Sequence, residues 1–187
     1  MTKKEKIVSK AKDLAIEYGQ RYVACAPTVF AAICDALRSE GIELFTPEVQ
    51  EQMFKGIVAL EGGTAAQGTG ACGAVAASVF LVSYVTDIGT RELTEDPDKT
   101  GVAHQNAIKG VISKFMKEYG TIVCRDIRFK RTGRIYSFLR TDTVHEMKQF
   151  MKEHTDICGI KDVTSNHPVI TGSGWGAGAV CDLKGIE

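Results

Sequence analysis

Residues 61–88, EGGTAAQGTGACGAVAASVFLVSYVTDI, decide how the rest of the chain is organised. A run of glycine and other small residues leads to Cys72, and the chain then enters its most hydrophobic segment. The apolar segment predicts a central helix, and the glycines before it predict a loop. A cysteine in the first turn of a helix lies near unpaired backbone N–H groups, which favour the thiolate. The small neighbours leave space for a cofactor or a second cysteine beside the Cys72 sulfur.

Other segments predict helices that pack around the central one, because hydrophobic residues recur in them at helical spacing. These predicted helices cover residues 4–18, 25–40, 46–60, 101–119 and 143–152. The fold class is therefore mostly α, a single-domain helical bundle of residues 1–187 with a glycine-rich loop before a central apolar helix. Its core is expected over about residues 22–160. Residues 161–187, rich in glycine, are expected to form an irregular C-terminal tail.

The composition argues against several classes of function. The chain has 23 basic and 23 acidic side chains, so no overall field favours nucleic acid. The apolar stretch 71–88 contains Asp87 and lacks flanking basic anchors, so we expect a buried helix rather than a membrane span. No secretory signal is visible, and we expect a cytoplasmic protein. In a reducing compartment, cysteines are more often ligands or reactive thiols than structural disulfides.

Motifs for nucleotide binding and hydrolysis are incomplete or absent. Gly68, Gly70 and Gly73 match the G-x-G-x-x-G pattern, but the dinucleotide fold needs a strand directly before the pattern. The preceding apolar run is too short and ends too early, so we do not expect nucleotide binding. No P-loop, HExxH motif or hydrolase triad occurs. His154 lies four residues before Cys158, a spacing that suits a metal, although a surface histidine is the simpler interpretation.

None of the six cysteines belongs to a C-x-x-C motif. This argues against a zinc ribbon, a thioredoxin site or a bacterial ferredoxin run, so any cysteine site must combine distant segments. Four cysteines lie at predicted helix ends and can therefore converge at one end of a bundle. They are Cys25 and Cys72 at two helix starts, and Cys124 and Cys158 just past two helix ends.

The other two cysteines do not fit this arrangement. Cys34 lies nine residues after Cys25 on one predicted helix, about 13 Å along its axis. That separation is too large for a disulfide or for one shared metal ion. Cys34 falls on the apolar stripe and is expected in the core, and Cys181 is given no role.

The order of these residues resembles a known protein family. Cys25, the GACGAVAA stretch at residues 70–77, Cys124 with Arg125 and Asp126, and Cys158 are similar to a C…GCAxxG…C…C cysteine pattern. A family of redox-active proteins is named for this pattern, and a domain of the kind is also part of split-Soret cytochrome c proteins. The resemblance covers roughly residues 22–160. It implies a mostly helical redox protein whose four cysteines form a redox-active disulfide centre or hold a cofactor such as an iron–sulfur cluster.

Three functions are open for Cys25, Cys72, Cys124 and Cys158. Four thiolates suit an iron–sulfur cluster or zinc, since both accept soft sulfur in a tetrahedral arrangement. Alternatively, two of the cysteines cycle as a thiol–disulfide oxidoreductase, with an attacking thiol of low pKa at a helix start. The third alternative is a non-catalytic helical protein with structural zinc.

The small residues around Cys72 favour ligands, and hence an electron-transfer protein with an iron–sulfur cluster or another metal. Whether the chain is an enzyme is left open. We expect a redox partner protein, no nucleic acid and no membrane. The apolar content also leaves room for a homodimer.

Overall fold

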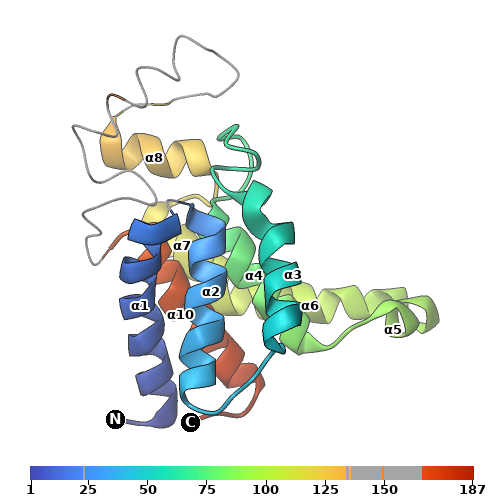
Figure 1. The fold of residues 1–187 in the computed structure, drawn as a ribbon. Helices are drawn as coiled ribbons and strands as arrows, with labels where there is room; N and C mark the ends of the chain where they lie inside the picture. The colour runs from blue at the N-terminus through green and yellow to red at the C-terminus, as the bar shows by residue number, and fades with distance from the viewer. Residues whose placement is uncertain (23, 134, 136–148, 150–165) are drawn as a thin grey trace.

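Helices form nearly all of the ordered structure, and a central group of them is surrounded by shorter ones (Figure 1). The computed structural model describes residues 1–22, 24–133, 135, 149 and 166–187. The helices are α1 (Lys3–Tyr22), α2 (Cys25–Ser39), α3 (Pro47–Ile57), η1 (Val58–Leu60), α4 (Gly73–Thr86), α5 (Thr90–Glu95), η2 (Pro97–Lys99), α6 (Thr100–Ala107), η3 (Ile108–Ile112), α7 (Ser113–Tyr119), α8 (Cys124–Thr132) and α10 (Pro168–Leu183). The prediction of a mostly helical bundle is confirmed. The predicted helix over residues 143–152 lies outside the described residues, apart from residue 149.

Local sequence accounts for several helix boundaries. Thr46 caps α3, because its hydroxyl accepts a hydrogen bond from the backbone N–H of Val49 at 3.4 Å, and Pro47 follows in the first turn. Gly120 and Gly133 directly follow α7 and α8 and terminate them. The predicted helix over residues 101–119 is present as α6 and α7, joined without a break by the π-helical turn η3.

The expected central helix is α4, and it packs against α2, α6 and α10. Its two faces are both apolar, as a helix in the middle of a bundle requires. Among the described residues, no helix is long and apolar enough to cross a membrane.

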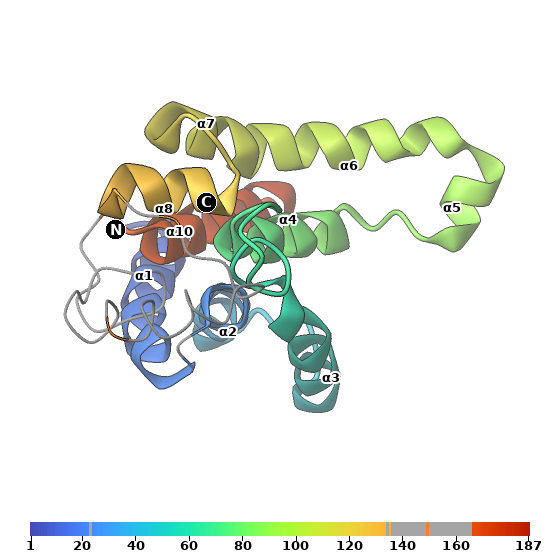
Figure 2. The same cartoon turned by 90° about the horizontal axis from the view of Figure 1, so that it is seen from above.

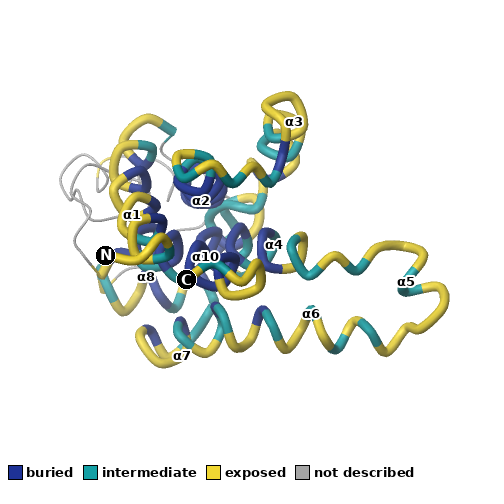
Figure 3. The backbone as a smooth tube through the Cα atoms, turned by 90° about the horizontal axis from the view of Figure 1, so that it is seen from below, coloured by how far each residue is buried: buried dark blue, intermediate teal, exposed yellow. Residues whose placement is uncertain are grey.

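The prediction of an irregular tail over residues 161–187 is wrong for Pro168–Leu183, which form the 16-residue helix α10. Far from lying outside the core, α10 packs against α1, α2 and α4, and most of its residues are buried (Figure 3). The N- and C-termini lie near each other as a result, with the backbone N–H of Lys4 donating to the carbonyl of Glu187 at 3.2 Å.

Close helix packing explains why a glycine-rich segment is helical here. A Cβ at Gly176 would lie 2.6 Å from Cδ1 of Ile33 and 2.7 Å from Oγ of Ser78. A Cβ at Gly172 would lie 3.0 Å from the Cβ of Ala74. Glycine costs about 1 kcal/mol relative to alanine in an isolated helix. Inside this bundle, however, it lets α10 approach α2 and α4 to distances that no larger residue permits, and the burial gained offsets the poor propensity.

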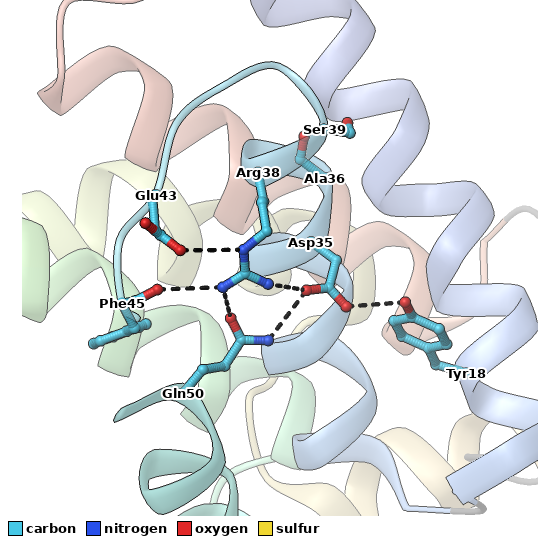
Figure 4. A network of polar contacts seen from close by, with 8 residues as sticks. All are labelled: Tyr18, Asp35, Ala36, Arg38, Ser39, Glu43, Phe45 and Gln50. Carbon is cyan, nitrogen blue, oxygen red and sulfur yellow. Dashed lines mark hydrogen bonds and ion pairs between the residues drawn. The ribbon is translucent and has the colours of Figure 1, made fainter. Parts of the chain in front are cut away.

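A polar network joins α1, α2 and α3 on the side of the bundle away from α10 (Figure 4). The Asp35 carboxylate accepts hydrogen bonds from the Tyr18 hydroxyl at 2.9 Å, from Nη1 of Arg38 at 2.8 Å and from Nε2 of Gln50 at 3.1 Å. Nη2 of Arg38 in turn donates to Oε1 of Gln50 at 2.6 Å. Burial, and then the nearby Asp35 carboxylate, raise the pKa of Tyr18. The network fixes α3, which otherwise contributes little to the core.

An arm formed by α5, η2 and α6 projects away from the bundle (Figure 2). Most of its residues are exposed, in contrast to α10. At its base, Nδ2 of Asn106 donates to Oγ1 of Thr86 at 3.1 Å and so ties α6 to the end of α4.

The packing of α10 predicts that replacing one of its glycines by alanine destabilises the protein, whereas helix propensity alone predicts the opposite. Gly176→Ala should lower the free energy of unfolding by about 1–3 kcal/mol, because its methyl group has to displace Ile33 and Ser78. Gly178→Ala is the matched control in the same helix, since its Cβ would meet only Cγ2 of Val8 at 3.6 Å. That variant should be as stable as the original or up to about 1 kcal/mol more stable. Urea denaturation followed by circular dichroism measures both, and equal effects would contradict the packing explanation.

Candidate functional site

Three of the four predicted site cysteines lie at helix starts and are buried. Cys25 is the first residue of α2, Cys72 is the N-cap of α4, and Cys124 is the first residue of α8. Their exposed fractions are 4%, 2% and 2%. Cys158 lies outside the described residues, as does His154.

Contacts around Gly73 place Cys25 beside the start of α4. A Cβ at Gly73 would clash with the sulfur of Cys25 and would lie 3.0 Å from the backbone nitrogen of Ala26. The Cys25 sulfur therefore occupies space that any other residue at position 73 would fill. Because Cys72 directly precedes Gly73, the starts of α2 and α4 bring these two cysteines together.

A short antiparallel pairing brings Cys124 to the same place. Ala71 and Val123 form an isolated bridge, flanked by two backbone hydrogen bonds. The N–H of Cys72 donates to the carbonyl of Ile122 at 2.7 Å, and the N–H of Cys124 donates to the carbonyl of Gly70 at 3.0 Å. The segments that enter α4 and α8 therefore run side by side, and Cys72 and Cys124 follow the paired residues.

The helix α8 is an element that the sequence analysis did not predict. Cys124 was expected just past a helix end, but it begins a new helix. Cys25, Cys72 and Cys124 consequently all lie at the positive end of a helix dipole, where a thiolate is stabilised. The capping glycine at position 133 was the available signal for this helix, whereas its strongly polar composition concealed it.

The glycine-rich loop folds over Cys124 as a left-handed turn. Positive φ angles occur at six positions, which are Gly62 (60°), Gly63 (76°), Thr64 (69°), Ala65 (47°), Ala66 (59°) and Gly68 (80°). A residue with a side chain costs about 1–2 kcal/mol in this conformation, and three such residues follow one another here. Such strain persists only where surrounding contacts impose it, and it is frequent at functional sites.

Backbone hydrogen bonds impose this conformation. The N–H of Gly68 donates to the carbonyl of Gly62 at 2.8 Å, and the N–H of Gly70 donates to that of Gly63 at 3.0 Å. The N–H of Arg125 donates to the carbonyl of Gly68 at 2.9 Å, which attaches the loop to the first turn of α8. A Cβ at Gly63 would lie 2.7 Å from the Cβ of Cys124, so the loop rests directly on this cysteine.

Tyr119, at the end of α7, is a buried polar group close to the cysteines. Its hydroxyl donates to the carbonyl of Asn166 at 2.7 Å and lies 2.7 Å from Oγ1 of Thr171. Burial raises the pKa of Tyr119 to about 12, although the hydrogen bond with Thr171 and the charge of Arg131 act in the opposite direction. The phenol therefore stays protonated at neutral pH, and its proton is used in the hydrogen bond to the carbonyl of Asn166.

Asn166 also marks where the chain returns after the segment that contains Cys158. Nη1 of Arg131, in the last turn of α8, donates to the carbonyl of Asn166 at 3.2 Å and lies 3.4 Å from its Oδ1. Asn166 therefore lies beside the last turn of α8, near the end of the helix at Gly133.

Cys34 and Cys181 lie elsewhere. Cys34 is 3% exposed within α2, and its prediction as a core residue is confirmed. Burial, and secondarily the charge of Asp35, raise the pKa of Cys34. Burial raises the pKa of Cys181, in α10, to about 11. Both cysteines are therefore protonated at neutral pH.

His167, one of the two histidines in the described part of the chain, has a structural role. His167 is fully buried, and its Nδ1 accepts a hydrogen bond from the N–H of Val169 at 3.2 Å, so it caps α10. Within the described parts of the chain, no group of three or more histidine, cysteine, aspartate or glutamate side chains is arranged to hold a metal ion.

An α-helical bundle with buried cysteines at three converging helix starts defines a class of multi-cysteine helical protein. The chain belongs to the family described as "Putative redox-active protein (C_GCAxxG_C_C)", whose model matches residues 23–163. This match includes all four cysteines predicted for the site, and the resemblance seen in the sequence is confirmed. No curated protein and no solved structure matches the chain.

Alanine substitutions at two glycines with the same backbone conformation test whether the loop packs against Cys124. Gly63 and Gly41 both have φ of 76°, but nothing lies within 4 Å of a Cβ at Gly41. Gly41→Ala should cost only the left-handed penalty of about 1–2 kcal/mol. Gly63→Ala should cost about 1–3 kcal/mol more, because its Cβ would lie 2.7 Å from the Cβ of Cys124 and 2.8 Å from the backbone of Gly68. Urea denaturation distinguishes the two costs, and equal losses would mean that the loop is not packed closely at Gly63 against Cys124 and Gly68.

Glu61, at the start of the loop, predicts a pH dependence of stability. Burial raises the pKa of its carboxyl above the ordinary value of about 4.3. The folded protein therefore binds this proton more tightly than the unfolded chain, and its contribution to stability is lost as pH rises through the raised pKa. Glu61→Gln should be more stable than the original protein at pH 7, and the difference should shrink towards pH 4. Thermal unfolding across this range measures it, and parallel curves would refute the prediction.

Proposed function

We propose that the protein is a redox protein that transfers electrons through an iron–sulfur cluster held by Cys25, Cys72, Cys124 and Cys158. The observation that carries this proposal is the burial of three of these cysteines at three adjacent helix starts. Family membership supports the redox class.

The residues present fit such a cluster in their chemistry. Thiolates are the ligands that iron–sulfur clusters prefer, and helix N-termini stabilise their negative charge. Gly73 lies against the sulfur of Cys25 and Gly63 against the Cβ of Cys124, and both present only backbone there. When bound, a cluster supplies one-electron transfer. The chain itself supplies the thiolates, the helix dipoles that hold their charge, and the covering loop that excludes water.

Burial also supports a cluster more than thiol–disulfide exchange with a protein substrate. An attacking thiolate must reach the sulfur of its substrate, and reactive cysteines are accordingly partly exposed. Cys25, Cys72 and Cys124 are at most 4% exposed. A disulfide cycle with small molecules is the alternative that the experiment below has to separate from the cluster.

Cys158 enters the proposal through the family match, which covers residues 23–163 and so includes all four cysteines.

Anaerobic purification with iron and sulfide analysis tests the proposal. The protein should show the broad visible absorbance of sulfide-to-iron charge transfer and should contain iron and acid-labile sulfide. Cys→Ser at position 25, 72, 124 or 158 should lower iron occupancy at least about tenfold, since even changes behind a ligand cost that much. Cys34→Ser is the matched control, because it removes a buried cysteine of α2 without touching the site, and it should retain the iron.

Other outcomes are equally clear. Colourless protein with one bound zinc would favour the structural alternative. Colourless, metal-free protein that loses two thiols on mild oxidation would favour the disulfide cycle. If the four site variants behave like Cys34→Ser in both iron content and thiol reactivity, the site itself is wrong.

A further inference from the structure

Apolar packing holds α3 only weakly to the bundle. Of its eleven residues, Pro47–Ile57, only Ile57 is buried. Most residues of α2 and α10, in contrast, are buried. A helix with few buried apolar contacts opens locally at a lower free-energy cost than the helices of the core. We therefore expect α3 to detach from the bundle more readily than α2 or α10.

Polar contacts of Gln50 attach α3 to α2 instead (Figure 4). Nε2 of Gln50 donates to Oδ1 of Asp35 at 3.1 Å, and Oε1 of Gln50 accepts from Nη2 of Arg38 at 2.6 Å. We name these two hydrogen bonds the latch. The side chains of Asp35 and Arg38 are 29% and 36% exposed, so water competes for the groups of the latch and reduces its net strength.

A cavity of about 290 Å³ lies beside the latch, between α3 and the helices α1 and α2. Tyr22 of α1 and Phe54 of α3 line it, with their ring centroids 5.3 Å apart, and the side chains of Asp35, Arg38 and Gln50 line it as well. This space leaves α3 less tightly packed than α10, whose glycines bring it directly against its neighbours. Water that enters the cavity can replace the hydrogen bonds of the latch as they break.

The helix α3 leads directly into the loop that covers Cys124. The turn η1 follows α3 without a gap, and residues 61–70 of the loop follow η1. Both ends of this stretch are anchored, because Phe45 before it is only 4% exposed and Ala71 after it pairs with Val123. A movement of α3 between these anchors therefore pulls on the loop.

The loop stores strain that detachment would release. Thr64, Ala65 and Ala66 have positive φ angles, which are unfavourable for residues with a side chain. The N–H groups of Arg125 and Cys124 hold the loop in this shape through its carbonyl groups. When these hydrogen bonds break, the three residues can relax, so the loop leaves Cys124 at a lower cost than a relaxed loop would.

We propose that residues 47–70 form a lid, which opens when the latch breaks and uncovers Cys124. Cys25, Cys72 and Cys124 are at most 4% exposed, so a molecule that has to touch their sulfurs needs such a movement. The proposed function gives the lid its purpose, which is to admit what the site binds. The lid itself depends only on the contacts of α3 and of the loop, and it would operate equally around a disulfide.

Hydrogen exchange of the full chain, followed by mass spectrometry, tests the lid independently of what the cysteines bind. Gln50→Ala removes both hydrogen bonds of the latch and leaves the buried core unchanged. It should speed exchange in residues 47–70 at least about fivefold, the factor that corresponds to the loss of one ordinary hydrogen bond. Gln52→Ala is the matched control, because Gln52 is exposed on the same helix, and it should exchange like the original protein. Exchange in α10 should be the same in all three proteins.

Labelling with N-ethylmaleimide, measured for each cysteine by mass spectrometry, tests whether the lid uncovers the site. Cys124 should react at least about fivefold faster in Gln50→Ala than in Gln52→Ala. Cys181, in α10, should react at the same rate in both variants. Labelling is repeated after iron has been removed with a chelator, so that the lid and the cluster fail separately. A difference that appears only after the removal of iron supports both proposals, and one that iron does not affect supports the lid alone.

Three results would overturn the lid. Equal exchange and equal labelling in Gln50→Ala and Gln52→Ala would mean that the latch does not hold α3. Faster exchange in α3 alone, with residues 61–70 unchanged, would mean that the helix and the loop move independently. Exchange that rises by the same factor in α10 would mean that α3 opens only when the whole bundle unfolds.

Discussion

The missing side chain at Gly73 lets the sulfur of Cys25 lie against the first turn of α4, and much of the structure depends on this contact. It fixes how closely the starts of α2 and α4 approach each other. The same principle operates deeper in the bundle, where Gly172 and Gly176 of α10 face α4 and α2. At these three glycines the helices are closer than ordinary side chains would permit. The site is therefore built on close backbone contacts rather than on side-chain contacts.

Three helix starts that face one region bring partial positive charges together, and negatively charged cysteines would offset this repulsion. Each N-terminus is equivalent to roughly half a positive charge, so gathering those of α2, α4 and α8 is unfavourable unless negative charge is present. Thiolates at Cys25, Cys72 and Cys124 would supply it. Cys34 and Cys181 show the opposite case, because burial without a helix start raises the pKa of each. Position within a helix therefore separates the site cysteines from the core cysteines more sharply than burial does.

Sequence reasoning succeeded where one segment determines its own structure. The apolar run after Cys72 and the proline starts of α2 and α3 contain their own signals, and so does the placement of Cys34 in the core. It failed for α10, because helix propensity penalises glycine and says nothing about neighbouring helices that need it. It also missed α8, whose charged sequence has little apolar periodicity. Cys124 was therefore given the wrong local structure, although its place beside Cys72 follows the prediction. The role of the four cysteines as ligands stays a prediction.

The strained loop over Cys124 explains why the missed helix α8 and the candidate site depend on each other. No rule of turn composition predicts three consecutive left-handed residues at Thr64, Ala65 and Ala66, since each costs free energy locally. The conformation is maintained by hydrogen bonds to distant partners, above all from the N–H of Arg125 to Gly68 and from the N–H of Cys124 to Gly70. These N–H groups are available to the loop because α8 begins at Cys124, and the first N–H groups of a helix have no partner within it. The carbonyls of the loop thus accept hydrogen bonds from the first N–H groups of α8. In return, α8 holds the loop in a shape that covers the cysteine without burying it under side chains.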